Sequence, residues 1–125
     1  MSAASVDPAL VLFAHGARDA RWAEPFARVL ARVAAAAPQR DPMLAYLEFM
    51  APGLREAVDR QVARGHRAIR IVPLFLGPGG HLRSDVPALV AEAARAHPGV
   101  DIRLAPAAGE DEGVIAALAA YSLHG

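Results

Sequence analysis

The sequence contains no cysteine and no lysine, and all 13 of its basic residues are arginines. Without cysteine, the chain has no disulfide framework, zinc finger, iron–sulfur ligand or cysteine nucleophile. Without lysine, it has no Walker-type phosphate loop, Schiff-base lysine or lysine general base. These two absences exclude whole classes of enzyme and metalloprotein.

The chain also lacks a long apolar segment and an excess of charge of one sign. No apolar run is long enough to span a membrane, and residues 1–5 lack the charged and apolar regions of an export signal. The 13 arginines are matched by 13 acidic residues, so the net charge favours neither nucleic acid nor an anionic membrane as a partner. We therefore expect a cytoplasmic protein that binds neither.

What the sequence does contain is an alternation of two patterns. Short apolar runs alternate with segments whose apolar residues recur at helical spacing. A chain of 125 residues suffices for one domain with a real core. We predict a flexible tail over residues 1–8 and a single domain over residues 9–125, with strands at 10–14, 43–47, 68–76 and 100–104, each followed by a helix.

Strand-then-helix units of this kind form a parallel sheet, because right-handed crossovers place the helices on the sheet faces. We expect a three-layer α/β fold of flavodoxin-like type, with strand order 2-1-3-4 and helices on both faces. The alternating apolar and polar residues of 100–104 suit an edge strand.

The sequence also suggests where the last two helices begin. Ser84 or Asp85 can cap the third helix, with Pro87 in its first turn. The acidic cluster at residues 110–112 suits the positive end of a helix dipole. It opens a last helix that carries the apolar residues Val114, Ile115 and Leu118.

Three polar residues stand just beyond the first three strands: His15, Glu48 and His81. The carboxyl ends of parallel strands meet at one edge of the sheet, where ligands bind at the switch point between the first and third strands. Two imidazoles and a carboxylate, with no thiolate, suit a divalent metal that must also be released. The sequence therefore predicts metal or proton-transfer chemistry at this edge.

Each of the three residues also has a purely structural interpretation. His15 can be a hydrogen-bonded turn histidine beside Gly16. His81 can belong to an ordinary strand-to-helix connection, although at the tip of the glycine-rich loop 77–80 it would be a movable ligand near amides that attract an anion. Glu48 can cap the turn that follows it or, just as well, face the crevice as a metal ligand or a base.

Other polar residues are less specific. Arg18, Arg83 and Asp85 flank the two histidines and could bind carboxylates or orient the rings, yet a solvated helix start explains them equally well. The remaining histidines stand at helix or chain ends, where solvated imidazoles are common. We assign no site role to these three, which are His66, His97 and His124.

Together, the segments 14–19, 47–48 and 72–81 resemble the short, single-domain sirohydrochlorin cobaltochelatases, which are class II chelatases. The match runs from Leu10 to the end of the chain and includes residues 106–111. The histidines, the glutamate and the glycine-rich loop agree in order and spacing. Members of that family usually carry serine where this chain has Ala17.

The resemblance implies insertion of cobalt(II) into sirohydrochlorin on the route to cobalamin. His15, Glu48 and His81 match the family's metal and proton-handling positions. We expect His15 and His81 to bind the ion and accept pyrrole protons, while Glu48 completes the ligand set or passes protons to solvent.

The resemblance also implies how the substrate is held. Its many carboxylates would face arginines and loop amides, namely those of Arg18, Arg83, Gly79 and Gly80. No tightly bound cofactor is expected, because cobalt is a substrate, with iron or nickel as its alternatives. By analogy with two-lobed relatives, a homodimer would supply a second wall for the flat tetrapyrrole.

Other functions fit some of the same residues. The chain could be a sirohydrochlorin ferrochelatase or a nickel chelatase, or a non-catalytic protein that binds metal or tetrapyrrole. A histidine phosphatase is a further alternative, because its motif also contains His-Gly. In that superfamily an arginine precedes the histidine, whereas Ala14 stands there in this chain.

Overall fold

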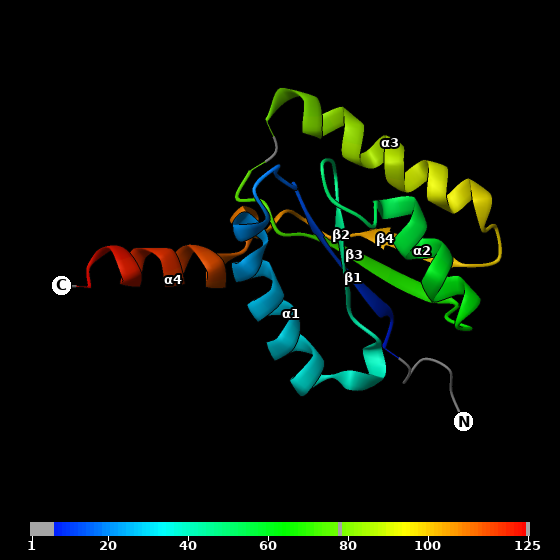
Figure 1. Ribbon diagram of the computed structural model, residues 1–125, viewed down its shortest axis with the longest axis horizontal. Coiled ribbons are helices and arrows are strands. Elements are labelled where there is room, and N and C mark those ends of the chain that lie inside the picture. Colours follow the sequence, from blue (N-terminus) through cyan, green and yellow to red (C-terminus); the bar gives the residue numbers. More distant parts are fainter. Residues whose placement is uncertain (1–6, 78, 125) are drawn as a thin grey trace.

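The computed structural model describes residues 7–77 and 79–124, with the backbone but not the side chains of residues 80–83. Its four strands are all parallel and form one sheet in the order β2-β1-β3-β4 (Figure 1). The sheet confirms the predicted α/β class and strand order. The strands are β1 (Ala9–Ala14), β2 (Met43–Tyr46), β3 (Ala68–Pro73) and β4 (Asp101–Leu104).

Helices lie on both faces of the sheet. On one face, α2 (Leu54–Ala63) packs beside α3 (Gly80–Ala96), while α1 (Glu24–Ala36) lies on the opposite face (Figure 1). The last helix is α4 (Glu112–Ser122). Short 3-10 helices occupy Ala20–Ala23, Pro38–Arg40 and Ala108–Glu110.

The core lies between the sheet and the α2–α3 layer. All six residues of β1 are buried, as expected of a central parallel strand that is covered on both faces. Alternate β1 side chains, those of Val11 and Phe13, pack with β3 residues and with the inner faces of α2 and α3. Burying each large side chain contributes roughly 1.5–3 kcal/mol, so this layer fixes the sheet that carries the site.

Hydrogen bonds and ion pairs hold the amino edge of the sheet. Asp41, at a positive φ of 47°, accepts hydrogen bonds from Arg64 at 2.8 Å and from His66 at 3.0 Å. The buried Gln61 Nε2 donates to the carbonyls of Leu10 and Asp41, both at 2.9 Å. These contacts tie α2 to β1 and to the turn before β2. Among the described residues, the buried Gln61 Oε1 accepts no hydrogen bond.

Two sequence-based boundaries differ from the structure. β3 ends at Pro73 rather than at residue 76. The Leu74 N–H still donates to the Phe13 carbonyl of β1, but Pro73 has no N–H to extend the pairing with β4. α3 begins at Gly80 with Gly79 as its N-cap, so Ser84 and Asp85 do not cap it and Pro87 lies inside the helix. The prediction placed Pro87 in a first turn, but a helix held by packing can tolerate one missing backbone hydrogen bond.

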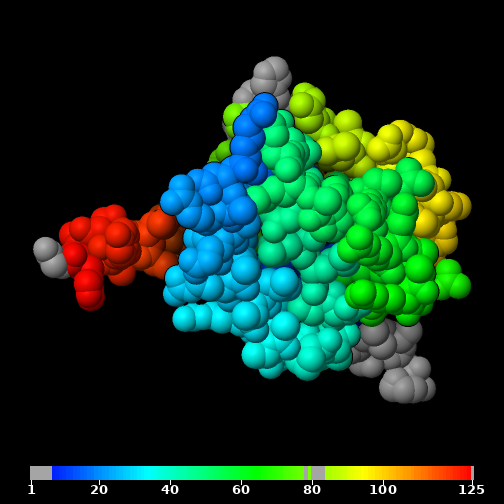
Figure 2. Space-filling model, in the orientation of Figure 1, coloured from blue at the N-terminus to red at the C-terminus, as the bar shows by residue number. Residues whose placement is uncertain are grey.

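The last helix forms where the acidic cluster predicts. The Asp111 side chain accepts a hydrogen bond from the Val114 N–H at 3.1 Å and so caps α4. However, no residue of α4 is buried, and the helix projects from the body of the molecule (Figure 2). Within the described part of the chain, no helix combines the length and apolar character needed to cross a membrane.

Candidate functional site

His15 and Glu48 meet at the carboxyl edge of the sheet. The register of β1 and β2 continues beyond both strands, because the Leu47 N–H donates to the Ala14 carbonyl at 2.9 Å and the Glu48 N–H to the His15 carbonyl at 3.1 Å. His15 Nε2 then lies 2.9 Å from Glu48 Oε2, with the side chains 46% and 48% exposed. A hydrogen-bonded imidazole and carboxylate open to solvent can exchange a proton or offer donor atoms to a metal.

Gly16 makes this close pairing of the two loops possible. Its φ is +96°, which glycine adopts readily and other residues rarely do. A Cβ atom at this position would also overlap the carbonyl oxygen of Glu48. The residue after His15 must therefore be glycine for the His15–Glu48 pair to form in this geometry.

Phe75 packs against the His15 ring and was not predicted as a site residue. The rings of Phe75 and His15 are 6.5 Å apart, edge to face, and Phe75 packs in the same manner on Phe13 at 5.8 Å. Phe75 thus connects the core residue Phe13 to His15, and its contact with the His15 ring limits the rotation of the imidazole. An aromatic residue near the end of the third apolar run was the sequence signal for it.

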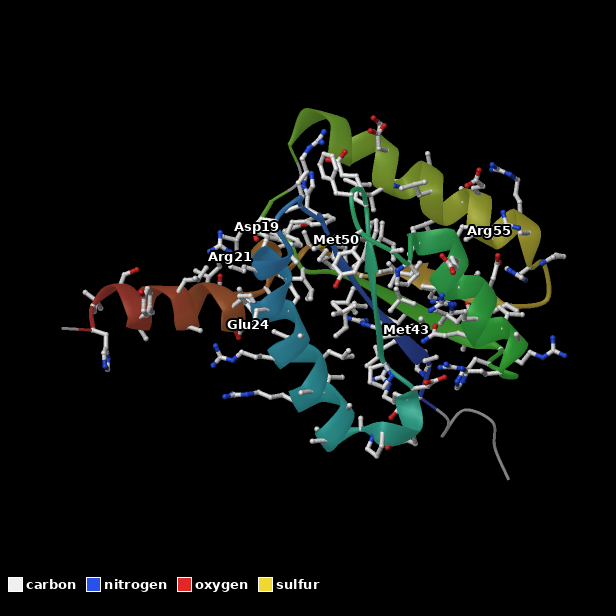
Figure 3. The ribbon with its side chains drawn as sticks, in the orientation of Figure 1. Asp19, Arg21, Glu24, Met43, Met50 and Arg55 are labelled. Carbon is white, nitrogen blue, oxygen red and sulfur yellow. The ribbon has the colours of Figure 1, made fainter. Side chains whose placement is uncertain are left out.

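Arg18 lies at the rim of the site. Its guanidinium stands over the Phe49 ring at 4.6 Å from the centroid, and Phe49 is exposed at a positive φ of 67°. Nearby, Arg21 pairs with Asp19, as the labelled side chains in Figure 3 show. Hydrogen bonds from Arg21 lower the pKa of Asp19. Arg21 is therefore engaged with Asp19, while Arg18 keeps its N–H groups at the exposed rim.

The glycine-rich loop leads directly into α3. Gly79 is exposed at the N-cap with an extended backbone, and Gly80, His81 and Arg83 occupy the first turn. This corrects the expectation that His81 stands at a loop tip. The side chains of His81 and Arg83 lie outside the described residues. The backbone alone places residue 81 beyond β3, which is the neighbour of β1 at this edge of the sheet.

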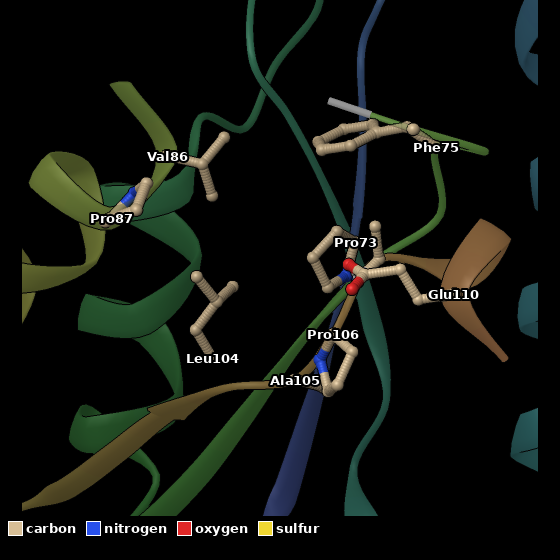
Figure 4. Close-up of a pocket in the computed structure, with 10 residues that line it drawn as sticks. Pro73, Phe75, Val86, Pro87, Leu104, Ala105, Pro106 and Glu110 are labelled. Carbon is tan, nitrogen blue, oxygen red and sulfur yellow. Dashed lines mark hydrogen bonds between the residues drawn. The ribbon is translucent and has the colours of Figure 1, made fainter. Parts of the chain in front are cut away.

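A cavity of about 720 Å³ opens beside the same edge. Its walls come from the ends of β3 and β4, from the loops that follow them and from Val86 and Pro87 of α3 (Figure 4). Among the described residues, the lining is apolar except for Glu110, whose Oε2 accepts a hydrogen bond from the Ala107 N–H at 3.3 Å. Phe75 lines the cavity and also touches His15, so the cavity adjoins the His15–Glu48 pair.

Of the predicted site residues, His15 and Glu48 are the two whose described side chains meet at this edge. Among the described residues no three histidine, aspartate or glutamate side chains lie close enough to hold a metal ion. His66 and His97 lie at the opposite edge, where they pair with Asp41 and Asp59. The sequence interpretation of these two as solvated is therefore wrong, although they stand away from His15.

Comparison with solved structures identifies proteins with the same overall fold. A CbiX protein of Marinobacter aquaeolei VT8, assigned to cobalamin (vitamin B12) biosynthesis, matches with a TM-score of 0.82 and 34% identity, covering 94% of this chain and 93% of that one. The sirohydrochlorin chelatase SirB of Bacillus subtilis subspecies spizizenii, solved in complex with cobalt, matches with a TM-score of 0.80 and 26% identity. That match covers 94% of this chain and 50% of SirB.

Sequence comparison gives relatives of the same kind. A sirohydrochlorin cobaltochelatase of Methanococcus aeolicus is 29% identical over 82 residues, which are 66% of this chain and 57% of the relative. The chain thus matches only part of the length of such curated relatives. The CbiX family model matches residues 9–122, which include both strands that carry the His15–Glu48 pair. The chain belongs to the CbiX family.

Proposed function

We propose that this chain inserts a divalent metal ion, cobalt(II) in the first place, into sirohydrochlorin. The observation that carries the proposal is the His15–Glu48 pair, joined at 2.9 Å and half exposed at the carboxyl edge of the sheet. Relatives named sirohydrochlorin cobaltochelatase and a SirB structure with cobalt support the choice of substrate and metal.

The chemistry requires bases next to the ion. When a divalent cation enters the macrocycle, two pyrrole N–H bonds break, metal–nitrogen bonds form and two protons leave. With its Nε2 proton donated to Glu48, His15 has a lone pair on Nδ1 that can bind the ion or accept a pyrrole proton. Glu48 then stabilises the imidazolium and, being half exposed, can pass a proton to solvent.

His81 is the proposed second imidazole. Residue 81 lies in the first turn of α3, beyond the strand that neighbours β1. In this proposal His15 and His81 hold the incoming ion, and Glu48 completes the set of donors.

The rim and the cavity would hold the macrocycle. Its carboxylates would face the guanidinium groups of Arg18 and Arg83 and the amides of Gly79 and Gly80. The cavity beside Phe75 would take an uncharged edge of the ring, because the described residues of its lining are mainly apolar.

Imidazole and carboxylate ligands bind cobalt, iron and nickel alike, so availability of the ion would decide among them. A relative named sirohydrochlorin ferrochelatase makes iron the leading alternative. In this proposal the metal is a substrate, no cofactor is tightly bound, and the reaction is cytoplasmic. A second copy of the chain would supply the second wall, since this chain matches half of the SirB chain.

The direct test incubates the purified protein with sirohydrochlorin and cobalt(II), iron(II) or nickel(II), and follows the absorbance of the macrocycle. A protein-free control measures spontaneous insertion. Insertion with cobalt well above that control is the expected result. No acceleration with any of the three metals overturns the proposal. Stoichiometric binding without turnover would then indicate a carrier, and activity in a colorimetric phosphatase screen would indicate a hydrolase.

A further inference from the structure

Phe49 has an unusual backbone conformation at the rim of the candidate site. Its φ is +67°, in the left-handed region that bulky residues rarely enter, and it is 55% exposed. Asp41 is the other non-glycine residue with a positive φ in the described part of the chain, and aspartate tolerates that region. An aromatic residue thus stands where neither its backbone conformation nor its exposure to solvent favours it. Residues strained in this way are concentrated at ligand-binding and active sites.

The Phe49 ring lies under the guanidinium of Arg18. The Cζ atom of Arg18 is 4.6 Å from the ring centroid, which is within the range of a cation–π contact. Arg18 follows β1 and Phe49 follows β2, so this contact joins the same two loops as the His15–Glu48 hydrogen bond. Because Glu48 and Phe49 are adjacent, the contact fixes the position of Arg18 relative to His15.

An aromatic partner leaves the hydrogen-bonding groups of an arginine available. Arg21, further along the same loop, pairs with Asp19 at 2.8 Å, so part of its guanidinium is already occupied. No acidic side chain among the described residues pairs with Arg18. The face of an aromatic ring attracts a guanidinium without accepting its N–H groups, which can then bind a carboxylate through two hydrogen bonds. The contact with Phe49 therefore suits an arginine that is held in place and still binds an anion.

We propose that Phe49 is a positioning residue, which holds Arg18 in the orientation that binds a carboxylate of the substrate macrocycle. This inference rests on the proposed function, because it takes the ligand to be a tetrapyrrole that carries carboxylates. Phe49 acts through Arg18 and takes no part in the metal or proton steps, which belong to His15 and Glu48. Holding Arg18 before the substrate arrives raises affinity, because less side-chain freedom is lost on binding. The strained backbone of Phe49 is what places its ring under Arg18.

The first test measures binding of metal-free sirohydrochlorin to the full chain by titration of the macrocycle's absorbance. Phe49→Leu keeps an apolar side chain at the same strained position but removes the aromatic face. We expect its Kd to rise roughly fourfold, the effect of one exposed cation–π contact, while Phe49→Trp stays close to the wild type. Phe26→Leu is the matched control, because the Phe26 ring packs on Trp22. An unchanged Kd for Phe49→Leu, or an equal rise in the control, overturns the proposal.

The second test asks whether Phe49 acts through Arg18. Arg18→Gln removes the positive charge and is expected to raise the Kd for sirohydrochlorin about tenfold. Without Arg18 there is no guanidinium for Phe49 to orient, so the double variant Arg18→Gln with Phe49→Leu should bind as weakly as Arg18→Gln alone. If Phe49→Leu raises the Kd by the same factor in both backgrounds, the ring contacts the macrocycle directly, and that result contradicts the positioning role.

The third test compares binding with stability. Phe49→Asn removes the ring and gives the position a residue that tolerates a positive φ. We expect its urea midpoint to lie above that of the wild type, because backbone strain is relieved, while its Kd rises at least as much as that of Phe49→Leu. A residue kept for the fold alone would change stability in the opposite direction. A lower urea midpoint for Phe49→Asn therefore overturns the proposal.

The rates of an active protein give a further test of the same role. Phe49→Leu should raise the KM for sirohydrochlorin by the same factor as the Kd and leave kcat unchanged, because His15 and Glu48 are untouched. Phe49→Trp should restore the KM. A fall in kcat at constant KM would place Phe49 in the chemical step and would contradict the positioning role.

Because the binding titrations need no metal, they separate this inference from the proposed function. A wild type that binds sirohydrochlorin, with the expected changes in the variants but no metal insertion, overturns the proposed function and supports the role of Phe49. A wild type that inserts cobalt, with normal binding by Phe49→Leu, does the reverse. A wild type that does not bind the macrocycle overturns both.

Discussion

At the scale of single residues, the proposed chemistry depends on how His15 and Glu48 share a proton. A carboxylate that accepts a hydrogen bond from imidazole fixes its tautomer and stabilises the charged ring. Glutamine at position 48 keeps the shape and can still accept the hydrogen bond, but it carries no negative charge and cannot act as a base.

Glu48→Gln is therefore expected to lower kcat/KM for cobalt insertion by about 10² without changing the fold, because the imidazolium loses its counter-charge. The measurement is the initial rate of the macrocycle's absorbance change. Glu56→Gln is the matched control, since Glu56 is an exposed glutamate that also accepts one hydrogen bond, from Arg60. Equal activity in both variants would remove Glu48 from the mechanism.

Gly16 and Gly65 allow a clean comparison of two alanine substitutions. Both glycines have nearly the same φ, +96° and +98°, but only Gly16 faces a backbone oxygen, while a Cβ at Gly65 meets nothing within 4 Å. We expect Gly65→Ala to cost about 1 kcal/mol of stability through backbone strain alone. Gly16→Ala adds the clash with Glu48, and should cost about 3 kcal/mol or more in urea unfolding. Equal losses of stability in the two variants would show that the loops containing Gly16 and Glu48 are not closely packed.

At the scale of elements, Asp41 connects the turn before β2 to the end of α2 and the start of β3. Partial burial acts to raise the pKa of Asp41, but hydrogen bonds from Arg64 and His66 together outweigh it and hold the pKa below its ordinary value of 3.8. A depressed carboxylate pKa stabilises the fold above the unfolded pKa, and this contribution is lost as the pH falls through the folded value.

Asp41→Asn is thus expected to lower the free energy of unfolding by about 1 kcal/mol between pH 5 and 7. Below about pH 4 the difference from the wild type should shrink, because the carboxylate takes up a proton first in the unfolded chain and then, as the pH falls through the lowered folded pKa, in the folded chain as well. Asparagine tolerates the positive φ of this position, so added backbone strain does not contribute to the measured difference in the free energy of unfolding. Urea titrations from pH 3 to 7 measure the difference. A difference that does not change with pH contradicts the ion-pair account.

Sequence patterns within one segment predicted the helices and strands well. Features that depend on contacts between distant residues could not be predicted in this way. The central strand β1 has an uninterrupted apolar run, and β4 alternates as an edge strand does, so the order of the sheet followed from residue types. The start of α3 did not follow, because a glycine N-cap gives no side-chain signal and Pro87 suggested a later start.

The candidate site was predictable only in part for the same reason. His15 and Glu48 end two adjacent strands, so topology alone brings them together. The roles of Phe75 against His15 and of Phe49 beneath Arg18 depend on loop conformation, which no periodicity encodes. The exposure of α4 was equally hidden, since its apolar residues match those of a helix that packs on its own sheet.

At the scale of the whole molecule, the His15–Glu48 pair, the start of α3 and the apolar cavity all lie along one edge of the sheet. In the proposed function, one chain would offer a single wall to the flat tetrapyrrole, and a second copy would supply the facing wall. In the proposed chemistry at this edge, His15 is the residue that takes part in both the metal step and the proton step.

The most direct measurement is the rate of cobalt insertion by His15→Ala relative to the wild type and to a protein-free control, at matched concentrations. His66→Ala serves as the comparison, because His66 also hydrogen-bonds a carboxylate but lies at the opposite edge of the sheet. We predict that His15→Ala falls to the spontaneous rate, with a fold unchanged by circular dichroism, while His66→Ala stays active. A His15→Ala protein that inserts cobalt as fast as the wild type would contradict the account.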